Sequence, residues 1–487
     1  MPPTAAFYFA PASSVHGTAE WVIYLEGGGW CYSAATCLAR RSANPGLISS
    51  NQWPETLRLS GMFDRDPRRN PFAGVNLVFV GYCSSDAWVG DGVGTDGVNY
   101  QFRGQAILQA LVTQLLNPAF SLTTAKGVVM AGCSEGARGV MANIDALVPL
   151  FPGGVQVRAV LDSPYELDVA PLLPADAATS LQNQTMAALT YVNASGALGK
   201  WCGAQYGETE PWKCLFGEYR LAFLESRYLA SFSQFDSWQV PLLVGSPPPF
   251  DPAQLAYVDA VQRDVREGAL ALPATQQPGS AVYSSACYRH CTTASGAFWG
   301  VRVNNFTLAQ YVSAWYFGYD GSPSSRYLAR APQVIEACSG FACGQCASLT
   351  TAAPAPPLPP ARLGLRSPPY SVPPAPSTRA SHRNANQLHS AKKVHLEDAL
   401  AALAAVLLLV CVARPVFRAA TKPSVLRAGT SGGGGGGQAE LTPLVAAQRG
   451  SSQFYKAKAG ALFQAGALGV SQGKLSRVTP HSSNTSL

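Results

Sequence analysis

A serine in a glycine-rich turn and a scarce histidine are the residues of this chain whose types could do chemistry together. Ser134 stands in Gly-Cys-Ser-Glu-Gly, directly after the apolar run 128–131. Such a pentapeptide between a strand and a helix is typical of a nucleophile elbow, in which the glycines relieve crowding around a sharply turned serine. Only His16 and His290 occur in the first 350 residues. Serine is a poor nucleophile at its free pKa and needs an adjacent base, so we expect His290 to be that base.

An acidic residue must orient the imidazole, and the sequence pattern leaves two candidates. In hydrolases with a nucleophile elbow, the acid lies between the serine and the histidine. Asp236 in Gln-Phe-Asp-Ser-Trp-Gln and Asp251 in Pro-Phe-Asp-Pro both qualify. The tetrahedral oxyanion also needs preorganised N–H donors. We expect the glycine loop 27–29 to offer them, together with the backbone N–H of Glu135.

Four short apolar runs of β-favouring residues indicate the strands that would position these groups. They occupy 21–25, 76–80, 127–131 and 157–161, and a helical pattern covers 100–116. Strands that alternate with helices predict the α/β class, with a mostly parallel sheet and helices on both faces. Ligands bind beyond the carboxyl ends of the strands in such sheets. The glycine loop and the serine turn both follow a strand, so we expect the site at that edge.

The composition changes once along the chain and predicts four regions. Residues 1–348 indicate one large globular α/β domain, and 349–395 a linker rich in Pro and Ser. An apolar run at 399–413 with basic residues after it predicts a single transmembrane helix over 396–418. The glycine-rich basic remainder, 419–487, is typical of a disordered tail that would face the cytosol.

The charge distribution argues against nucleic acid as a partner. Residues 1–350 hold 20 Lys and Arg against 25 Asp and Glu, a net charge of −5, whereas 351–487 carry +12. The basic excess therefore lies outside the predicted domain.

Cysteine usage favours an oxidising compartment. Eleven cysteines lie in the first 350 residues, and we expect disulfides, with Cys133 as the odd free thiol. Cys343 and Cys346 resemble half of a zinc site only in spacing, and we expect neither a metal nor a cofactor. Three sequons also fit secretion, at Asn183, Asn193 and Asn305. No signal peptide opens the chain, so we expect its N-terminus to be incomplete and the mature protein to be an extracellular or cell-wall-facing, single-pass type I protein.

Five blocks of the domain, in one order from about residue 6 to 318, resemble the pectin acetylesterase family, which also contains the Notum carboxylesterases. The blocks are Trp21-Val-Ile-Tyr-Leu-Glu-Gly-Gly-Gly-Trp-Cys31, Gly81-Tyr-Cys-Ser-Ser-Asp86 with Gly90-Asp91, Gly132-Cys-Ser134, Phe235-Asp-Ser-Trp-Gln239 and Cys287-Tyr-Arg-His-Cys291. The resemblance implies an α/β-hydrolase fold and a carboxylesterase triad of Ser134, Asp236 and His290. It thereby favours Asp236 over Asp251. It also implies that the oxyanion donors are the N–H groups of Gly28, Gly29 and Glu135.

The chain departs from this family's pattern at three places. Glu135 follows the serine where the family usually has a small residue, and we expect its carboxylate to point away or to pair with Arg138. Leu-Asp-Ser-Pro around Asp162 replaces a Ser-Asp-Ala-Gly-like stretch and would reshape the pocket wall. The apolar strand usually found before the acid is reduced to 228–233. These differences bear on efficiency and substrate more than on the class of reaction.

We expect the substrate to be an acetylated, pectin-like polysaccharide of the cell wall or matrix, from which O-acetyl groups are removed. The candidate substrate contacts lie beside the motif turns, and the aromatic ones fit core packing equally well: Trp30, Asp86, Trp88 and Trp238. A candidate basic patch, against the simpler interpretation of a solvated loop, comprises Arg65, Arg68 and Arg69. Two alternatives stay open: a Notum-like lipid or palmitoleoyl-protein deacylase, and an inactive membrane-tethered glycan-binding protein. The sequence does not predict the oligomeric state.

Overall fold

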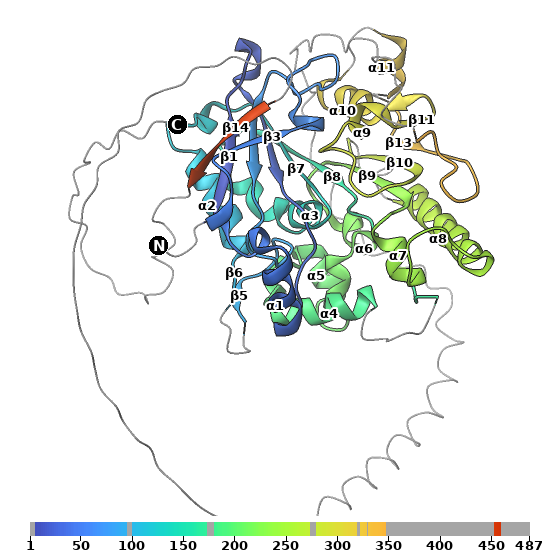
Figure 1. Cartoon of the computed structure of the whole chain (residues 1–487). Helices are drawn as coiled ribbons and strands as arrows, with labels where there is room; N and C mark the ends of the chain where they lie inside the picture. Colours follow the sequence, from blue (N-terminus) through green and yellow to red (C-terminus); the bar gives the residue numbers. More distant parts are fainter. Residues whose placement is uncertain are drawn as a thin grey trace, which may run out of the picture. The chain divides into compact units, whose positions relative to one another are not determined.

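A ten-stranded sheet organises the part of the chain that the computed structural model describes, which is residues 5–94, 100–172, 180–272, 279–318, 322–328, 330–346 and 452–458 (Figure 1). The strand order is β13-β10-β9-β8-β7-β2-β4-β1-β14-β3. The strands from β13 to β4 run parallel to one another, and β1, β14 and β3 add an antiparallel edge. Their bounds are β1 Ala6–Ala10, β2 Glu20–Leu25, β3 Thr56–Leu59, β4 Asn76–Val80, β7 Gly127–Cys133, β8 Gln156–Asp162, β9 Tyr228–Phe235, β10 Ala281–Tyr288, β13 Gln333–Ile335 and β14 Ser452–Lys458. Two small hairpins pair β5 Gly92–Val93 with β6 Gln101–Phe102 and β11 Arg302–Val303 with β12 Phe306–Thr307.

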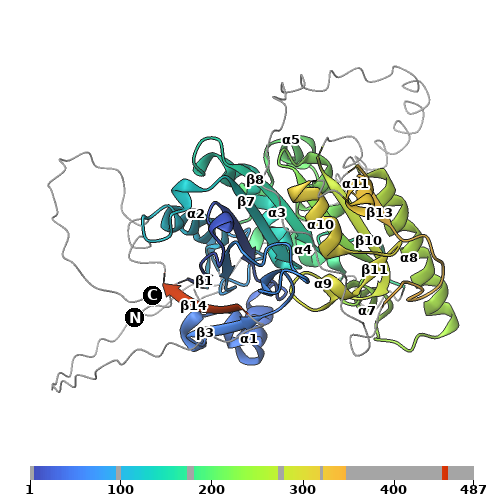
Figure 2. The same cartoon turned by 90° about the horizontal axis from the view of Figure 1, so that it is seen from above.

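Helices cover both faces of the sheet (Figure 2). Successive strand residues point to opposite faces, and Val22 and Ile23 of β2 accordingly belong to different hydrophobic clusters. Leu111 and Val140 pack in the cluster of Ile23, whereas Val312 packs in the cluster of Val22. The helices are α1 Ala34–Ala43, α2 Gly104–Leu115, α3 Glu135–Leu147, α4 Leu181–Tyr191, α5 Lys200–Tyr206, α6 Gly217–Arg220, α7 Gln239–Val244, α8 Pro252–Ala271, α9 Ala297–Gly300, α10 Leu308–Phe317 and α11 Pro323–Leu328.

The four predicted strands are present as β2, β4, β7 and β8, and α2 occupies most of the predicted helix. Every residue of β2, β4 and β7 is buried. Continuous apolar runs are what parallel strands need when helices cover both faces of the sheet. The expected α/β class with a mostly parallel sheet is confirmed.

Strand β9 differs from the expected reduced strand before Asp236. It extends over Tyr228–Phe235, and all eight residues are buried despite its serines and glutamine. Ser233 Oγ donates a hydrogen bond to the carbonyl oxygen of Cys287, and Gln234 Nε2 donates to that of Glu336 at 2.9 Å. Buried polar side chains are tolerated when they are hydrogen-bonded, so this strand keeps its full length without an apolar sequence.

Five disulfides join ten of the described cysteines and confirm the expectation of an oxidised domain: Cys31–Cys37, Cys133–Cys291, Cys202–Cys214, Cys287–Cys346 and Cys338–Cys343. Cys83 is the one described cysteine that is free. The prediction that Cys133 is unpaired is therefore wrong. Its Cα lies 5.7 Å from that of Cys291, a spacing suited to a disulfide, although 158 residues separate the two in sequence.

The C-terminal region departs from the predicted disordered tail at one place. Strand β14 (red in Figure 1) pairs antiparallel with both β1 and β3. The predicted linker 349–395 and transmembrane helix 396–418 lie outside the described residues, as does the rest of 419–487. Within the described ranges, no helix combines the length and the apolar character needed to cross a membrane.

Candidate active site

Ser134 occupies the turn between β7 and α3 in a backbone conformation that few residues adopt. Its φ of 57° and ψ of −126° are costly for a residue with a side chain. Close backbone contacts require the flanking glycines. A Cβ on Gly132 would lie 2.4 Å from the carbonyl carbon of Gly136, and a Cβ on Gly136 would lie 2.1 Å from the carbonyl oxygen of Leu25. This is the geometry of a nucleophile elbow at the carboxyl end of a parallel sheet.

The Glu135 carboxylate fills the position in front of the glycine loop. Its Oε2 accepts hydrogen bonds from the N–H groups of Gly28, at 3.3 Å, and Gly29, and from Ser134 Oγ at 2.9 Å. These loop amides are the predicted oxyanion donors, so the carboxylate stands where an oxyanion would be bound. The expectation that Glu135 points away or pairs with Arg138 is wrong, because three converging donors that would otherwise lack an acceptor bind it here.

Glu135 is ionised at neutral pH in this position. Burial works against its charge, but the guanidinium of Arg138 and the hydrogen bonds from Ser134 and the Gly29 N–H hold its pKa below the usual value. The residue is 1% exposed. The donors of the loop therefore face a fixed negative charge.

Arg40 of α1 orients the glycine loop and was missed by sequence reasoning. Its Nη2 donates to the carbonyl oxygens of Gly28 and, at 3.0 Å, of Gly29, and its Nε donates to Ser85 Oγ at 2.6 Å. The φ values of 135° at Gly28 and 73° at Gly29 favour glycine. With the carbonyl groups bound by Arg40, the loop N–H groups face Glu135. No local motif marks an arginine on a neighbouring helix for this task.

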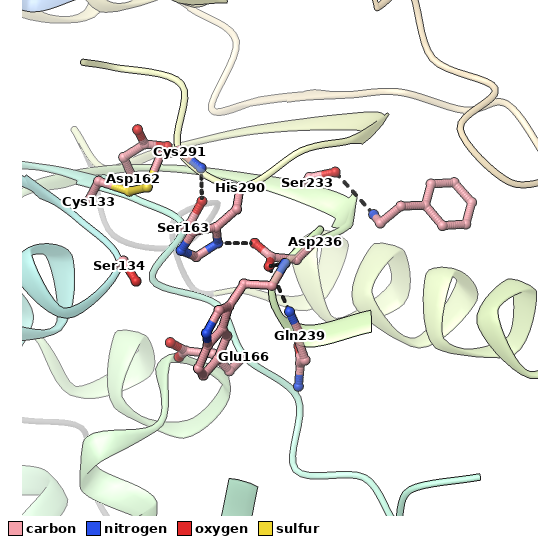
Figure 3. Close-up of polar contacts among 12 residues, drawn as sticks. Cys133, Ser134, Asp162, Ser163, Glu166, Ser233, Asp236, Gln239, His290 and Cys291 are labelled. Atoms are coloured by element: carbon pink, nitrogen blue, oxygen red, sulfur yellow. Dashed lines mark hydrogen bonds and ion pairs between the residues drawn. A yellow bond between two sulfur atoms is a disulfide. The ribbon is translucent and has the colours of Figure 1, made fainter. Parts of the chain in front are cut away.

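The structure brings His290 and Asp236 together. Asp236 Oδ2 lies 2.7 Å from His290 Nδ1, and Figure 3 shows the imidazole between Ser134 and Asp236. Asp236 Oδ1 accepts hydrogen bonds from the backbone N–H groups of Trp238, at 2.8 Å, and Gln239, at 3.0 Å. The start of α7 thus holds the carboxylate in one orientation. His290 Nε2 is buried and has no hydrogen-bond partner among the described residues.

Asp251, the other candidate acid, has a different task. Its Oδ1 accepts hydrogen bonds from the backbone N–H groups of Ala253 and Gln254, each at 2.8 Å, and caps α8. A carboxylate that caps a helix satisfies donors that have no partner within that helix. The geometry therefore selects Asp236 as the neighbour of His290.

The environment of His290 favours its charged form. Burial lowers the pKa of the imidazole, but the adjacent Asp236 carboxylate, with Glu135 and Asp162, raises it to about 9. The ring is therefore mostly protonated at pH 7. Trp238 is half-buried beside it, with the two ring centres 6.0 Å apart.

The loop that carries His290 is held by contacts of the three residues that follow it. The Cys133–Cys291 disulfide joins the residue before Ser134 to the residue after His290. Asp162 Oδ2 accepts from the N–H groups of Thr292 and Thr293, each at 2.6 Å. Asp162 is fully buried, so it supports this loop and does not form the pocket wall that we expected it to reshape.

Cys133, His290 and Cys291 also offer ligand atoms within 4.8 Å of one another. The two sulfur atoms are joined in a disulfide, so in the oxidised protein this group has no thiolate to offer a metal.

Two of the four predicted substrate contacts are core residues. Asp86 and Trp88 are both fully buried. Asp86 Oδ2 accepts from the N–H of Gly104 at 2.7 Å, and Trp88 Nε1 donates to the carbonyl oxygen of Glu26 at 2.9 Å. They shape the loops behind the glycine turn but cannot touch a substrate. A motif identifies such residues without showing on which side of the backbone they lie.

The predicted basic patch is absent from the described surface at Arg65, Arg68 and Arg69. Arg65 donates to four backbone carbonyl oxygens. Arg68 pairs with Asp66 at 2.7 Å and Arg69 with Asp64 at 3.6 Å. The neighbouring aspartates neutralise the two exposed arginines, so this loop offers no excess positive charge.

A buried ion pair beside the site was not predicted. Arg138 Nη2 donates to Glu166 Oε1 at 2.7 Å, and its guanidinium lies 4.2 Å from the centre of the Trp30 ring. Trp30, the third predicted contact, is 7% exposed and packs on this arginine. Burial raises the pKa of Glu166 to about 7, and the charges of Glu135, Asp236 and His290 also act on it. The pair is therefore electrostatically part of the same site, as the position of Glu166 in Figure 3 illustrates.

Sequence and structural similarity relate this chain to known proteins. The sequence profile of the family described as pectinacetylesterase matches residues 3–327. The palmitoleoyl-protein carboxylesterase NOTUM of Mus musculus is 29% identical over 313 residues, which cover 61% of this chain and 59% of that protein. Pectin acetylesterase 5 of Arabidopsis thaliana is 29% identical over 336 residues, which cover 64% of this chain and 75% of that protein. The chain thus spans about six-tenths of the length of the mouse relative.

The crystal structure of the Wnt deacylase Notum from Drosophila has a similar fold. The TM-score is 0.61 with 24% sequence identity, and the match covers 71% of this chain and 94% of that one. At this identity the similarity bears on the fold.

Proposed function

Because the chain belongs to the pectinacetylesterase family, we propose that it is a serine carboxylesterase in which Ser134, His290 and Asp236 are the catalytic residues. The observation that carries the proposal is the 2.7 Å contact between His290 Nδ1 and Asp236 Oδ2. In addition, the Cys133–Cys291 disulfide joins the loop of His290 to the strained turn of Ser134. A serine needs a positioned base, and a base needs an acid that fixes its orientation.

In the proposed reaction, Ser134 Oγ attacks the carbonyl carbon of the ester while His290 Nε2 takes the hydroxyl proton. The new C–O bond converts the carbonyl oxygen into an oxyanion, which the N–H groups of Gly28, Gly29 and Glu135 stabilise. Collapse breaks the ester C–O bond, and His290 gives its proton to the leaving alcohol. Water then attacks the acyl-serine in the same manner, which releases the carboxylic acid and restores the serine.

The substrate class that we propose is a polysaccharide carrying short O-acyl groups such as acetyl. The relatives include enzymes named for both short and long acyl groups, an acetylesterase in Arabidopsis and a palmitoleoyl-protein carboxylesterase in the mouse. The family described as pectinacetylesterase matches residues 3–327, and the match covers 75% of the Arabidopsis acetylesterase against 59% of the mouse relative, which supports the short group. The five disulfides support a location in the secretory pathway or outside the cell.

One observation favours a second candidate, a glycan-binding protein without turnover. The Glu135 carboxylate fills the position of the oxyanion and accepts the hydrogen bond of Ser134. A protein that kept this arrangement would bind but not hydrolyse an ester.

An acyl-chain-length series tests the proposal. The wild type, Ser134→Ala and the exposed control Ser42→Ala would be assayed on 4-nitrophenyl esters from acetyl to dodecanoyl, and on acetylated polygalacturonan with acetate release as the readout. We expect the highest kcat/KM for acetyl, with Ser134→Ala at background and Ser42→Ala at the wild-type rate. Wild-type turnover in Ser134→Ala would overturn the catalytic assignment. A preference for dodecanoyl would favour a lipid deacylase, and binding of the polysaccharide without turnover would favour the glycan-binding protein.

A further inference from the structure

We propose that Glu135 is a gate on the oxyanion site, with a closed position on the amides of the glycine loop and an open position on Arg138. The inference rests on the serine esterase function proposed above. It assigns a role to the one acidic side chain that lies between the proposed nucleophile and its oxyanion donors.

The closed position is the one in this structure. The N–H groups of Gly28 and Gly29 donate to Glu135 Oε2, and Ser134 Oγ donates to the same oxygen at 2.9 Å. A substrate carbonyl oxygen must accept from the same N–H groups, so the ester and Glu135 compete for one site. The hydroxyl proton of Ser134 is directed at Glu135, whereas His290 Nε2 has no partner within the described residues. The Glu135 carboxylate thus blocks both the binding of the substrate carbonyl oxygen and the transfer of the Ser134 proton to His290.

The open position is offered by Arg138, three residues further along α3 and therefore on the same side of the helix. One nitrogen of its guanidinium, Nη2, is paired with Glu166. Its Nε and Nη1 are buried and have no partner in the described parts of the chain. The side chain is 1% exposed and packs on the Trp30 ring, so the unpaired nitrogens are held inside the site. Unpaired buried donors are unfavourable, and a carboxylate is the acceptor they bind best.

The two positions differ in the side chain of Glu135 alone. Rotation toward Arg138 would exchange the loop amides for the unpaired guanidinium nitrogens and keep the carboxylate hydrogen-bonded in both states. The backbone N–H of Glu135 stays at the start of α3 and remains the third oxyanion donor. Ser134 Oγ is then free to donate to His290. Arg138 is thus a positioning residue, whose contribution depends on the presence of Glu135.

Labelling of Ser134 by a fluorophosphonate measures the gate, because the phosphonyl oxygen needs the same amides as an ester. Four proteins would be compared: the wild type, Glu135→Ala, Arg138→Met and the double variant, with the exposed Glu208→Ala as control. If the closed form holds about nine-tenths of the molecules, Glu135→Ala should label at least about tenfold faster than the wild type. Arg138→Met should label at least about threefold more slowly, because Glu135 loses its alternative partner. The labelling rate of the double variant should match that of Glu135→Ala within about twofold, because the carboxylate that Arg138 would bind is absent from both.

Equal labelling of the wild type and Glu135→Ala would overturn the gate while leaving the esterase in place. If Arg138→Met slows labelling and the double variant is slowed equally, the arginine has a structural role, and this result would also overturn the gate. If no protein is labelled at Ser134, the proposed esterase function fails and the gate fails with it. If Arg138→Met does not fold, as thermal unfolding would reveal, a crystal structure of the wild-type phosphonate adduct decides. The gate requires the Glu135 carboxylate on Arg138, and a carboxylate elsewhere refutes it.

Discussion

The pH dependence of hydrolysis should follow the protonation of His290. The imidazole must be neutral to take the proton of Ser134, and its pKa is raised to about 9. At pH 7 only about 1 molecule in 100 then carries the neutral ring. We expect kcat/KM to rise about tenfold for each pH unit above 7 and to level off above pH 9. The difference from the ordinary value of 6.5 corresponds to roughly 3 kcal/mol in favour of the imidazolium.

Two substitutions separate the causes of this raised pKa. Burial alone lowers the pKa of His290, and the Asp236 carboxylate is the largest of the groups that raise it, ahead of Glu135 and Asp162. Asp236→Asn should therefore lower the pKa of His290, and the plateau rate should fall on the order of 10⁴-fold because the ring loses its anchor. Glu135→Gln removes a weaker charge with little change in shape and should lower the pKa of the rising limb by roughly one pH unit.

The assay is kcat/KM for 4-nitrophenyl acetate from pH 5 to 10.5, corrected for spontaneous hydrolysis. Glu208→Gln is the matched control. Glu208 is exposed and lies in the turn after α5, so the substitution removes a surface carboxylate without changing the site. Imidazole resonances of His290 in Ser134→Ala would give the same pKa without turnover. A rising limb near pH 6.5 in the wild type, or identical limbs for Glu135→Gln and Glu208→Gln, would refute the electrostatic reasoning.

Three further predictions concern the scaffold of the site. Replacing both Cys133 and Cys291 by Ser should cost about 2–5 kcal/mol of unfolding free energy and should reduce kcat/KM even at temperatures where the variant is folded, as denaturant titration and kinetics would reveal. Gly136→Ala should destabilise by more than about 2 kcal/mol because its Cβ meets a backbone oxygen at 2.1 Å, whereas Gly153→Ala, with nothing within 4 Å, should leave the melting temperature unchanged. Arg40→Met should lower kcat with little change in the melting temperature, because the carbonyl groups of Gly28 and Gly29 lose the arginine that binds them. A lower melting temperature with an unchanged kcat would contradict this.

Local sequence patterns sufficed for the elements that carry the site. The apolar runs at β2, β4, β7 and β8 predict strands because helices on both faces of a parallel sheet bury every residue of β2, β4 and β7 and the last four residues of β8. The Gly-x-Ser-x-Gly pattern predicts the sharp turn because its glycines make contacts that no side chain permits. Strand β9 was underestimated, since hydrogen bonds to distant backbone groups replace the apolar residues that the pattern requires.

The choice of His290 needed only a count of histidines, and the resemblance then favoured Asp236 over Asp251. The structure agrees because Asp251 caps α8, whereas Asp236 lies 2.7 Å from the imidazole. Two acidic residues fifteen positions apart look alike in a local pattern, and only their place relative to His290 separates them.

By itself, the sequence determined the α/β class, the elbow around Ser134 and the histidine that could serve it, because these follow from local periodicity, turn chemistry and composition. Only the tertiary structure decided where the side chains between those groups lie. The Glu135 carboxylate accepts hydrogen bonds from the backbone N–H groups of Gly29 and Gly28, which are 106 and 107 residues away in sequence. Cys133 forms a disulfide with Cys291, 158 positions away. Asp86 and Trp88 face the core although their motif adjoins the site. Such contacts depend on distances across the folded chain, and a one-dimensional pattern does not contain those distances.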